Sequence, residues 1–394
     1  MSLLIAFLIF CFIFAFQRNM YRRHWDRGLL AKLSFDKNHL ECGEDATLTL
    51  EIENRKLLPL PVFHLKYSVD RSFVFDENEN SAVTDLYYKN DAFSILGNQR
   101  IIRRHSFHGT KRGVYDIPSC TVHVKDFFLI STFAKQLEQS SLLYVFPKKI
   151  RSSEYDELMR GIMGEIAARN SLIEDNMTFR GIRDYTSFDG MRSINWRQSA
   201  KRSELMVNLY DHTMDREVRI LLNLDTENMI HPTRLLETSI SLASSISRDL
   251  LKKKTGVSLV TNGMTRKSGR LFDTMENMKS VSFRITEDHV NLPPVGKGSD
   301  MSHALTIDKV LSSILASSGK DEFLRLLDAE IKRAEENVFY LIISPYHKAD
   351  IAERLRRMQQ RDIGAAMVVP YYDTLGFNNP RKGMYGLEVM MDED

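Results

Sequence analysis

The stretch FRGIRDYTSFDGMRSINWRQSAKRSELMVNLYD, residues 179–211, separates two kinds of sequence. The residues before it alternate between apolar and polar as strands do, whereas those after it alternate between strand and helix patterns. The stretch contains Tyr185 and Trp196, and Trp196 is one of only 2 tryptophans in the chain. Its charged residues are Arg180, Arg183, Asp184, Asp189, Arg192, Arg197, Lys201, Arg202, Glu204 and Asp211. We therefore interpret residues 179–211 as the joint between two architectures.

Two interpretations of this joint follow from its residue types. Interleaved arginine and aspartate usually form a structural ion-pair network, here with a tryptophan packed beneath it. The alternative is a binding surface, because Arg and Trp bury large planar areas and often anchor protein interfaces. The candidate partner-binding residues are Arg183, Asp184, Tyr185, Asp189, Arg192, Trp196 and Arg197.

The order of these residues also carries a family resemblance. The pattern Arg183-x-Tyr185 with Asp189-x-x-Arg192-x-Ile194-x-Trp196-x-x-Ser199-Ala200 resembles the signature of the bacterial domain-of-unknown-function family fifty-eight. Ser187-Phe188 stand where members usually have Gly-Asp, and Asn195 replaces their usual aspartate. The resemblance implies a membrane protein with a von Willebrand A-like domain that works with a MoxR-type AAA+ ATPase. That partner is implied by the resemblance alone.

Composition excludes few classes of protein. A chain of 394 residues holds about two or three domains. Its formal net charge of +2 gives no reason to expect a nucleic-acid-binding surface. The 3 cysteines, Cys11, Cys42 and Cys120, lack metal-binding spacing and indicate a reducing compartment. A disulfide between Cys42 and Cys120 stays open, because both lie in the β-rich region.

The N-terminus carries an apolar run, Leu3 to Phe16. We predict a transmembrane anchor over residues 1–21, which reaches spanning length only with its flanks. A signal peptide is the alternative, but no positive charge precedes the run and no small-x-small cleavage site follows it. Arginines 18, 22, 23 and 27 follow, with Tyr21 and Trp25 as candidate interface anchors. Positive flanks stay inside, so we expect a cell-membrane protein with its N-terminus outside and its bulk cytoplasmic.

Residues 31–150 are predicted to form a β-sandwich of immunoglobulin-like type. Period-two alternation, as in Leu48, Leu50 and Ile52, recurs in short segments separated by turn residues. Strands are expected near 98–107, 112–125 and 141–147. Three histidines of this region, His105, His108 and His123, lack the companion ligands of a metal site.

Residues 151–178 are predicted to be a helical linker, with a helix from Ser152 to about Ala168. Residues 179–394 combine the joint with an α/β domain of mostly parallel sheet. Two strands, Leu205–Tyr210 and Glu217–Leu224, are expected around a turn at 211–215. The further elements expected are a helix at 233–254, a strand at 257–260, helices at 304–316 and 320–336, a strand at 338–343, a helix at 348–361 and a strand at 365–369. A loop at 373–386 and an edge strand at 387–389 complete the prediction.

The α/β domain resembles a von Willebrand A-like domain, in which Asp-x-Ser-x-Ser holds a divalent cation. The matching positions here are Asp225, Glu227 and Met229. A thioether is a poor ligand for a hard cation, so Asp225 and Glu227 remain only a degraded metal site. We expect no cofactor and no metal, with Asp225 ending its strand in ordinary turn chemistry.

No enzyme motif is present in the sequence. It lacks a phosphate-binding glycine loop followed by Lys-Ser/Thr, a G-x-S-x-G elbow and H-E-x-x-H. We therefore expect a non-enzymatic membrane-anchored scaffold or adaptor that binds other proteins and no nucleic acid. One alternative is a cryptic hydrolase centred on the charged cluster at 183–202, with Asp184, Tyr185 and Asp189 as its acid–base groups. Another is a metal-dependent adhesion-type module that uses Asp225.

Overall fold

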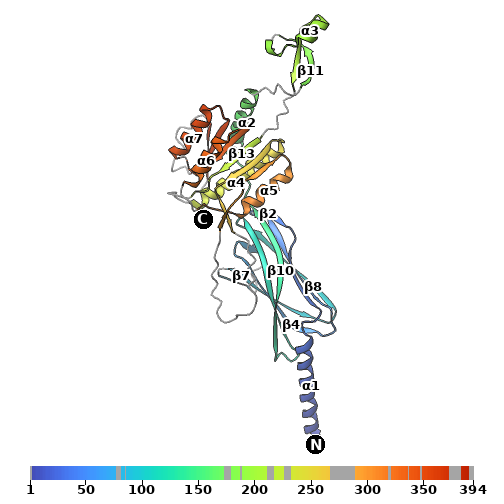
Figure 1. Cartoon of the computed structure of the whole chain (residues 1–394). Coiled ribbons are helices and arrows are strands. Elements are labelled where there is room, and N and C mark those ends of the chain that lie inside the picture. Colours follow the sequence, from blue (N-terminus) through green and yellow to red (C-terminus); the bar gives the residue numbers. More distant parts are fainter. Residues whose placement is uncertain are drawn as a thin grey trace. The chain divides into compact units, whose positions relative to one another are not determined.

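The computed structural model in Figure 1 shows a multidomain chain rich in β-sheet, with an apolar helix at its N-terminus. Contacts divide the chain into two compact units, each considered by itself below. The first unit comprises Met1–Lys148 with Leu311–Ser313, and the second comprises Lys149–Val310 with Ile314–Asp394. The structure describes residues 2–76, 81–84, 86–172, 179–186, 189–210, 217–225, 232–266, 289–317, 321–335, 337–346, 348–371 and 383–389.

The N-terminal helix α1 runs from Ser2 to His24. Its segment Leu3–His24 is long and apolar enough to cross a membrane, since 22 residues at 1.5 Å each give about 33 Å. Its large side chains lie exposed along the apolar stretch, as in Phe7 and Phe12. This confirms an apolar N-terminal helix of the kind found in membrane anchors and in signal segments.

The strands of the first unit form two mostly antiparallel sheets. One has the order β1-β3-β8-β5 and the other β2-β10-β9-β4-β7-β6. Their bounds are β1 Leu29–Phe35, β2 His39–Glu41, β3 Asp45–Asn54, β4 Leu60–Asp70, β5 Phe73–Phe75, β6 Ser81–Val83, β7 Leu86–Ile95, β8 Gln99–Gly109, β9 Gly113–Lys125 and β10 Thr132–Phe146. Strand β3 buries every second residue, and its inner residues share one apolar core with those of β4 and β9. Two sheets around a common core make a β-sandwich.

The end of α1 belongs to this sandwich. Tyr21 is 1% and Trp25 is 8% exposed, and both lie in the core cluster of the first unit. The Tyr21 hydroxyl donates to the Pro59 carbonyl at 2.7 Å, and Trp25 stacks on Phe133 with ring centroids 5.9 Å apart. The prediction that Tyr21 and Trp25 anchor the helix at a membrane interface is therefore wrong, because protein surrounds both rings.

The second unit is built on a sheet of order β17-β14-β13-β19-β20-β21, parallel except for the edge strand β17. The strand bounds are β13 Glu217–Leu222, β14 Gly256–Thr261, β17 Val295–Gly298, β19 Val338–Ile343, β20 Ala365–Tyr371 and β21 Met384–Glu388. The helix bounds are α2 Ser153–Leu172, α4 Pro232–Lys252, α5 Met301–Ser313, α6 Glu322–Lys332 and α7 Ala349–Gln360. All six residues of β19 are buried, as expected of a central strand covered on both faces.

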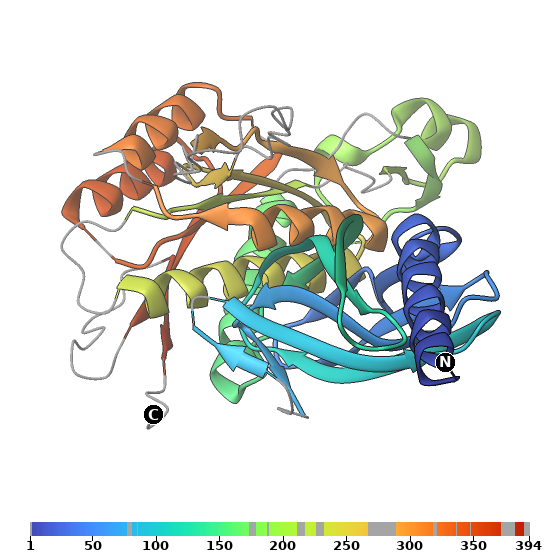
Figure 2. The same ribbon diagram turned by 90° about the horizontal axis from the view of Figure 1, so that it is seen from below.

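Helices cover both faces of this sheet (Figure 2). Helices α6 and α7 pack through Phe323, Leu327 and Leu355 onto the face that carries Tyr340 and Ile342. Helix α4 lies on the other side, where it contacts β13, β14, β19 and β20. The polar ends of the parallel strands therefore meet along one edge, which is where open α/β sheets place their functional groups.

Several predictions about the second unit need correction. Helix α2 is not a linker, because it belongs to the second unit and contacts β21. The predicted strand at 205–210 forms as β12, Met206–Tyr210, but it pairs with the unpredicted β11, Phe179–Asp184, instead of the strand after it. The predicted turn at 211–215 lies outside the described residues. Part of the predicted C-terminal loop is strand β21. Three further short strands were not predicted and form their own sheet: β15 Met264–Arg266, β16 His289–Asn291 and β18 Ile314–Leu315.

Candidate functional site

The joint predicted from sequence folds locally into a small substructure, here called the charged segment (residues 179–186 and 189–210). Strands β11 and β12 pair antiparallel, and between them lie the 3-10 helix η1, Met191–Ser193, and helix α3, Trp196–Arg202. Asn195 begins α3, because its Oδ1 accepts from the Gln198 amide at 3.1 Å. Ser203 ends it in the left-handed conformation, with φ of 59°.

Arg183 and Asp189 form the strongest polar contact of the charged segment. The guanidinium donates through Nη1 to Oδ2 at 2.7 Å and through Nη2 to Oδ1 at 2.5 Å. Thr186 adds its backbone amide and its hydroxyl, each 2.8 Å from Oδ2. These donors, Arg183 first, hold the pKa of Asp189 far below its usual range. A carboxylate held so firmly in its charged form is a weak proton acceptor, which disfavours Asp189 as a general base.

Two further motif residues hold the segment together. The Asn195 Nδ2 donates to Asn208 Oδ1 on β12 at 2.7 Å. The buried Ser199 hydroxyl donates to the Asn195 carbonyl at 2.8 Å and accepts from the Met206 amide at 2.9 Å. These contacts tie α3 to β12. An amide at 195 therefore has a structural role in this chain.

The other motif residues face solvent. Trp196 is 65% exposed, and the apolar residues Met191 and Leu205 of the same segment are 79% and 45% exposed. Arg192 and Arg197 are exposed as well. The expectation of a tryptophan packed beneath the ion pairs is thus wrong, since the indole stands outside them. We call Met191, Arg192, Trp196 and Arg197 the exposed face.

Two of the predicted binding residues, Asp184 and Tyr185, make backbone hydrogen bonds within the segment and are not part of this face. Asp184 is exposed, and its carbonyl accepts from Arg183 Nη1 at 2.9 Å. Tyr185 is half-buried, and its amide donates to the Leu205 carbonyl at 2.9 Å. Met191 and Leu205 are not among the predicted binding residues, although large apolar residues in an arginine-rich stretch are a usable signal.

The second candidate place is the polar edge at the carboxyl ends of β13, β14 and β19. Asp225 is 6% exposed. Its Oδ1 accepts from Asn262 Nδ2 at 2.5 Å, and its Oδ2 accepts from the Tyr346 hydroxyl at 3.4 Å. Nearby, Asn223 Nδ2 donates to the Ser344 hydroxyl at 3.0 Å. Asp225 is thus part of a buried network, and more than the turn-forming residue expected.

Burial raises the pKa of Asp225, and the negative charge of Glu322 acts in the same direction. Glu322 itself accepts from the Ser317 hydroxyl at 2.8 Å, and Ser317 is bridged to Asp225. Glu227 and Met229 lie outside the described residues. Within the part of the chain that is described, His, Cys, Asp and Glu nowhere gather in threes suited to a metal. Here both oxygens of Asp225 are taken by protein donors, a poor fit to a cation site.

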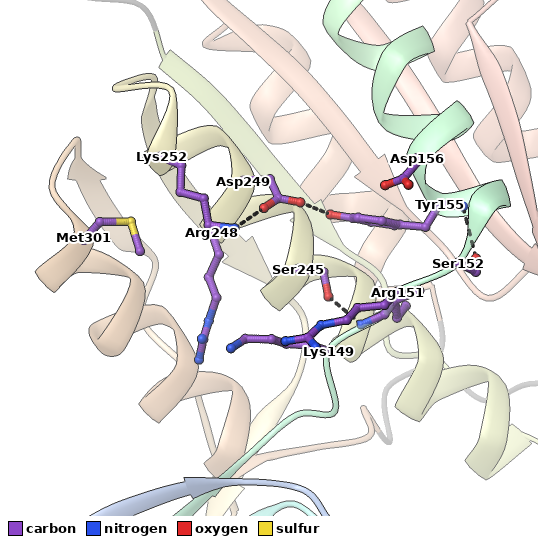
Figure 3. Close-up of a pocket in the computed structure, with 11 residues that line it drawn as sticks. Lys149, Arg151, Ser152, Tyr155, Asp156, Ser245, Arg248, Asp249, Lys252 and Met301 are labelled. Carbon is purple, nitrogen blue, oxygen red and sulfur yellow. Dashed lines mark hydrogen bonds and ion pairs between the residues drawn. The ribbon is translucent and has the colours of Figure 1, made fainter.

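The third candidate place is a cavity of about 620 Å³ in the second unit (Figure 3). It is lined by Lys149, Ile150, Arg151, Ser152, Tyr155, Asp156, Ser245, Arg248, Asp249, Lys252 and Met301. Figure 3 shows Tyr155 and Lys252 reaching Asp249 from opposite sides, with bonds of 2.8 Å and 2.7 Å. Burial and the Asp249 charge raise the pKa of Tyr155.

The contacts in this cavity fix α2 to α4. The Ile150 amide donates to Ser245 Oγ at 3.1 Å, and Arg248 pairs with Asp308 of α5 at 2.6 Å. Arg248, Asp249 and Lys252 therefore use their charges in contacts within the protein. Nothing local in the sequence predicts it, since Tyr155 and Asp249 are 94 positions apart.

Three further side chains of the first unit, those of His105, Cys42 and Cys120, have polar partners within the protein. His105 Nε2 lies 3.2 Å from Asp91 Oδ2 in the buried layer between the strands. Cys42 and Cys120, both in the described part of the chain, are not joined by a disulfide. Cys42 Sγ donates to the Thr110 carbonyl at 2.9 Å, and Gln139 Nε2 donates to Cys120 Sγ at 3.4 Å.

No protein-family profile and no characterised protein sequence matches this chain at a significant level. Among solved structures, a non-cellulosomal cohesin from Archaeoglobus fulgidus is 12% identical, with a TM-score of 0.20 over 32% of this chain and 96% of the cohesin. The seventh ScaB cohesin of Pseudobacteroides cellulosolvens is 11% identical, with a TM-score of 0.21 over 31% of this chain and 94% of the cohesin. The CARDB domain of a Pyrococcus furiosus protein is 9% identical, with a TM-score of 0.18 over 29% of this chain and 90% of the CARDB domain.

Proposed function

We propose that this protein is a non-enzymatic, membrane-anchored adaptor whose charged segment binds a protein partner. The observation that carries the proposal is the exposure of Trp196, at 65%, beside exposed arginines. Burying an indole and a guanidinium together is a common way to form the centre of a protein interface. Arg183 and Asp189 shape the segment just before these residues, because their paired contact joins Asp189 to the end of β11.

The partner we propose is a MoxR-type AAA+ ATPase, which is what the family resemblance of this segment implies. In the same proposal the first unit is an immunoglobulin-like sandwich and the second a von Willebrand A-like domain without a working cation site. The exposed Arg18, Arg22, Arg23 and Arg27 at the end of α1 favour a cytoplasmic position for both units. An ATPase in the cytoplasm could then reach the charged segment.

Binding between the purified full chain and a purified MoxR-type ATPase, with and without ATP, tests the proposal. The variant Arg192→Ala/Trp196→Ala is expected to weaken binding at least roughly thirtyfold, as loss of one interface hot spot does. The matched control is Ile102→Ala/Arg104→Ala, which removes an exposed apolar side chain and an exposed arginine from β8. The control should bind as the wild type does.

Two outcomes would count against the proposal in different ways. If wild type and both variants bind the ATPase equally, the charged segment has only a structural role. If the wild type does not bind any MoxR-type ATPase, the partner class is wrong. The hydrolase alternative finds no support in a firmly ionised Asp189, and the adhesion alternative finds none in the hydrogen-bonded Asp225.

A further inference from the structure

The turn between β9 and β10 is unusually apolar for a surface turn. Its residues run Asp126-Phe-Phe-Leu-Ile-Ser131. Phe127, Leu129 and Ile130 are 63%, 52% and 67% exposed. Surface turns are mostly built from small polar residues, glycine and proline. Four large apolar residues in succession at a tip therefore indicate an environment other than water.

This turn contacts the apolar stretch of α1, within the first unit. The Phe128 ring is 6.2 Å from the ring of Phe10 and 5.8 Å from that of Phe14, centroid to centroid. Phe14 and Phe10 precede Arg18 by four and eight positions. At 1.5 Å per residue, they lie about 6 and 12 Å from Arg18 along the helix. The turn thus reaches beyond the arginine level, beside the part of α1 suited to hydrocarbon.

The backbone of the turn is suited to the same environment. Asp126 Oδ1 accepts from the Ile130 amide at 2.8 Å. The Leu129 amide donates to the Asp126 carbonyl at 3.0 Å, and the Asp126 amide donates to the Ser131 carbonyl at 3.1 Å. Internal bonding of this kind is required where water is absent. Leu129 has φ of 60°, a conformation in which glycine or asparagine is relaxed, so an apolar side chain occupies a position that favours other residues.

Other loops at this end of the sandwich also expose leucines. Leu57, in the β3–β4 loop, is 84% exposed, and Leu96, after β7, is 65% exposed. The two loops touch, because the Leu57 backbone fills the space a side chain at Gly97 would need. Both belong to the α1 end, where the Arg55 amide donates to the Gly28 carbonyl at 2.8 Å.

Cations lie close to these apolar tips. Arg18, Arg22 and Arg23 on α1 and Arg55 in the β3–β4 loop are all exposed. Arg55 is paired with Glu53 at 2.9 Å, so the arginines of α1 are the cations that we expect to meet anionic headgroups beside the apolar turn. The contacts of Phe128 with Phe10 and Phe14 favour lipid over a soluble partner. If α1 spans the bilayer, a residue packed against its apolar stretch lies in the bilayer too.

We propose that the Phe127–Ile130 turn is a second membrane-embedded element, which enters the leaflet beside α1 and seats the sandwich on the bilayer surface. The inference rests on the anchoring role of α1 in the proposed function. It adds a contact that a single spanning helix would not provide, and it restricts how far the sandwich can tilt away from the membrane.

Depth-dependent quenching by brominated lipids tests this in the full chain, reconstituted in vesicles of phosphatidylcholine and phosphatidylglycerol. Three variants carry a reporter indole: Phe127→Trp in the turn, Phe12→Trp on the exposed side of α1, and Val74→Trp on β5. Val74 is 41% exposed and pairs with His108, at the end of β8 away from the α1 end. The natural Trp25 and Trp196 contribute the same signal to all three, and circular dichroism checks folding.

We expect bromines on the acyl chains to quench the reporters at 127 and 12 to a similar extent and to leave the one at 74 unquenched. Quenching at 12 with none at 127 would overturn the inference while leaving the anchor intact. In that case a second copy or another protein covers the turn, and cross-linking from position 127 would show it. No quenching at either 12 or 127 would overturn the anchor as well. Partner binding by the charged segment is measured separately and does not enter this result.

Discussion

Arg183 clamps Asp189 through two parallel N–H···O bonds of 2.7 Å and 2.5 Å. The motif residues of the charged segment fall into two groups, and the Arg183–Asp189 pair belongs to the first. One group, with Asn195 and Ser199, is bonded inward and shapes the segment. The other, with Arg192 and Trp196, faces outward. A single cluster of charged residues in the sequence therefore contains both residues that hold the segment together, here called the support, and residues that are free to meet a partner.

The first prediction concerns the support. Asp189→Asn removes the ionised acceptor of Arg183 and Thr186, so the contacts of residue 189 with these two residues should break more often. Amide hydrogen exchange at Thr186 should become faster than in the wild type, while the fold of both units is unchanged. Unaltered exchange would mean that the Arg183–Asp189 pair does not protect this amide.

The same pair has a defined pH dependence. The pKa of Asp189 is lower in the folded chain than in the unfolded chain. Its contribution is therefore fully present above the unfolded-state pKa and is lost as the pH falls through the folded-state pKa. Protection of the Thr186 amide, corrected for intrinsic exchange, should stay constant across neutral and mildly acidic pH. A loss of protection near pH 6 would show that another group controls this amide.

The second prediction concerns Asp225. Asp225→Ala leaves the buried Asn262 amide and Tyr346 hydroxyl without their acceptor, which costs about 1–3 kcal/mol of stability. Asp225→Asn keeps an oxygen for Asn262 and should cost less. Denaturant unfolding of the second unit measures both. Equal losses in the two variants would contradict the role assigned to the hydrogen bonds.

The pKa of Asp225 is raised, so its pH dependence has the opposite sign to that of Asp189. The folded chain binds the proton more tightly than the unfolded chain. Stability of the second unit should therefore fall as the pH rises from the usual aspartate value through the raised value. Asp225→Asn should lack this component, and comparing the two pH profiles isolates it.

The third prediction concerns the end of α1. Trp25→Ala removes a buried ring that stacks on Phe133, so the first unit should lose about 3–5 kcal/mol of stability. Tyr21→Phe removes only the hydrogen bond to Pro59 and should cost about 1 kcal/mol. Unfolding of the first unit, followed in detergent micelles, measures both. The exposed Ile102→Ala is the control, and a loss equal to that of Trp25→Ala would contradict the packing.

The fourth prediction concerns Cys120. Burial raises the pKa of its thiol to about 11, which lowers the thiolate fraction at neutral pH roughly a hundredfold relative to an ordinary cysteine near 9. Cys120 should therefore react with iodoacetamide only after the first unit unfolds. Mass spectrometry of the labelled peptide gives the rate. Fast labelling in the folded protein would place the thiol at the surface.

The sequence predicted the elements with long, regular patterns. Strand β19 was predicted to the residue, because a continuous apolar run between helices is typical of a central parallel strand. The apolar N-terminal helix and the β-rich, multidomain chain are confirmed. Strands of two to four residues, such as β15 and β18, are too short to show a period. The immunoglobulin-like and von Willebrand A-like assignments stay predictions.

Contacts between distant residues account for what the sequence could not predict. Tyr21 and Trp25 have the amphipathic chemistry of interface anchors, and only the position of Pro59 and Phe133 makes them core residues. Asp225 meets Asn262 and Tyr346 across 37 and 121 positions. Trp196 differs, because the helix that carries it is held by residues close in sequence. Its exposure could still not be predicted, since an indole among charged residues is equally typical of a buried and of an exposed site.

The most direct test of the adaptor role is photo-cross-linking from position 196. A benzophenone amino acid replaces Trp196 in the full chain, which is then mixed with a purified MoxR-type ATPase and ATP. We predict a cross-link to the ATPase from position 196 and none from the same group at Ile102. Binding of the ATPase with no cross-link from position 196 would contradict it, because the partner would then contact a different surface.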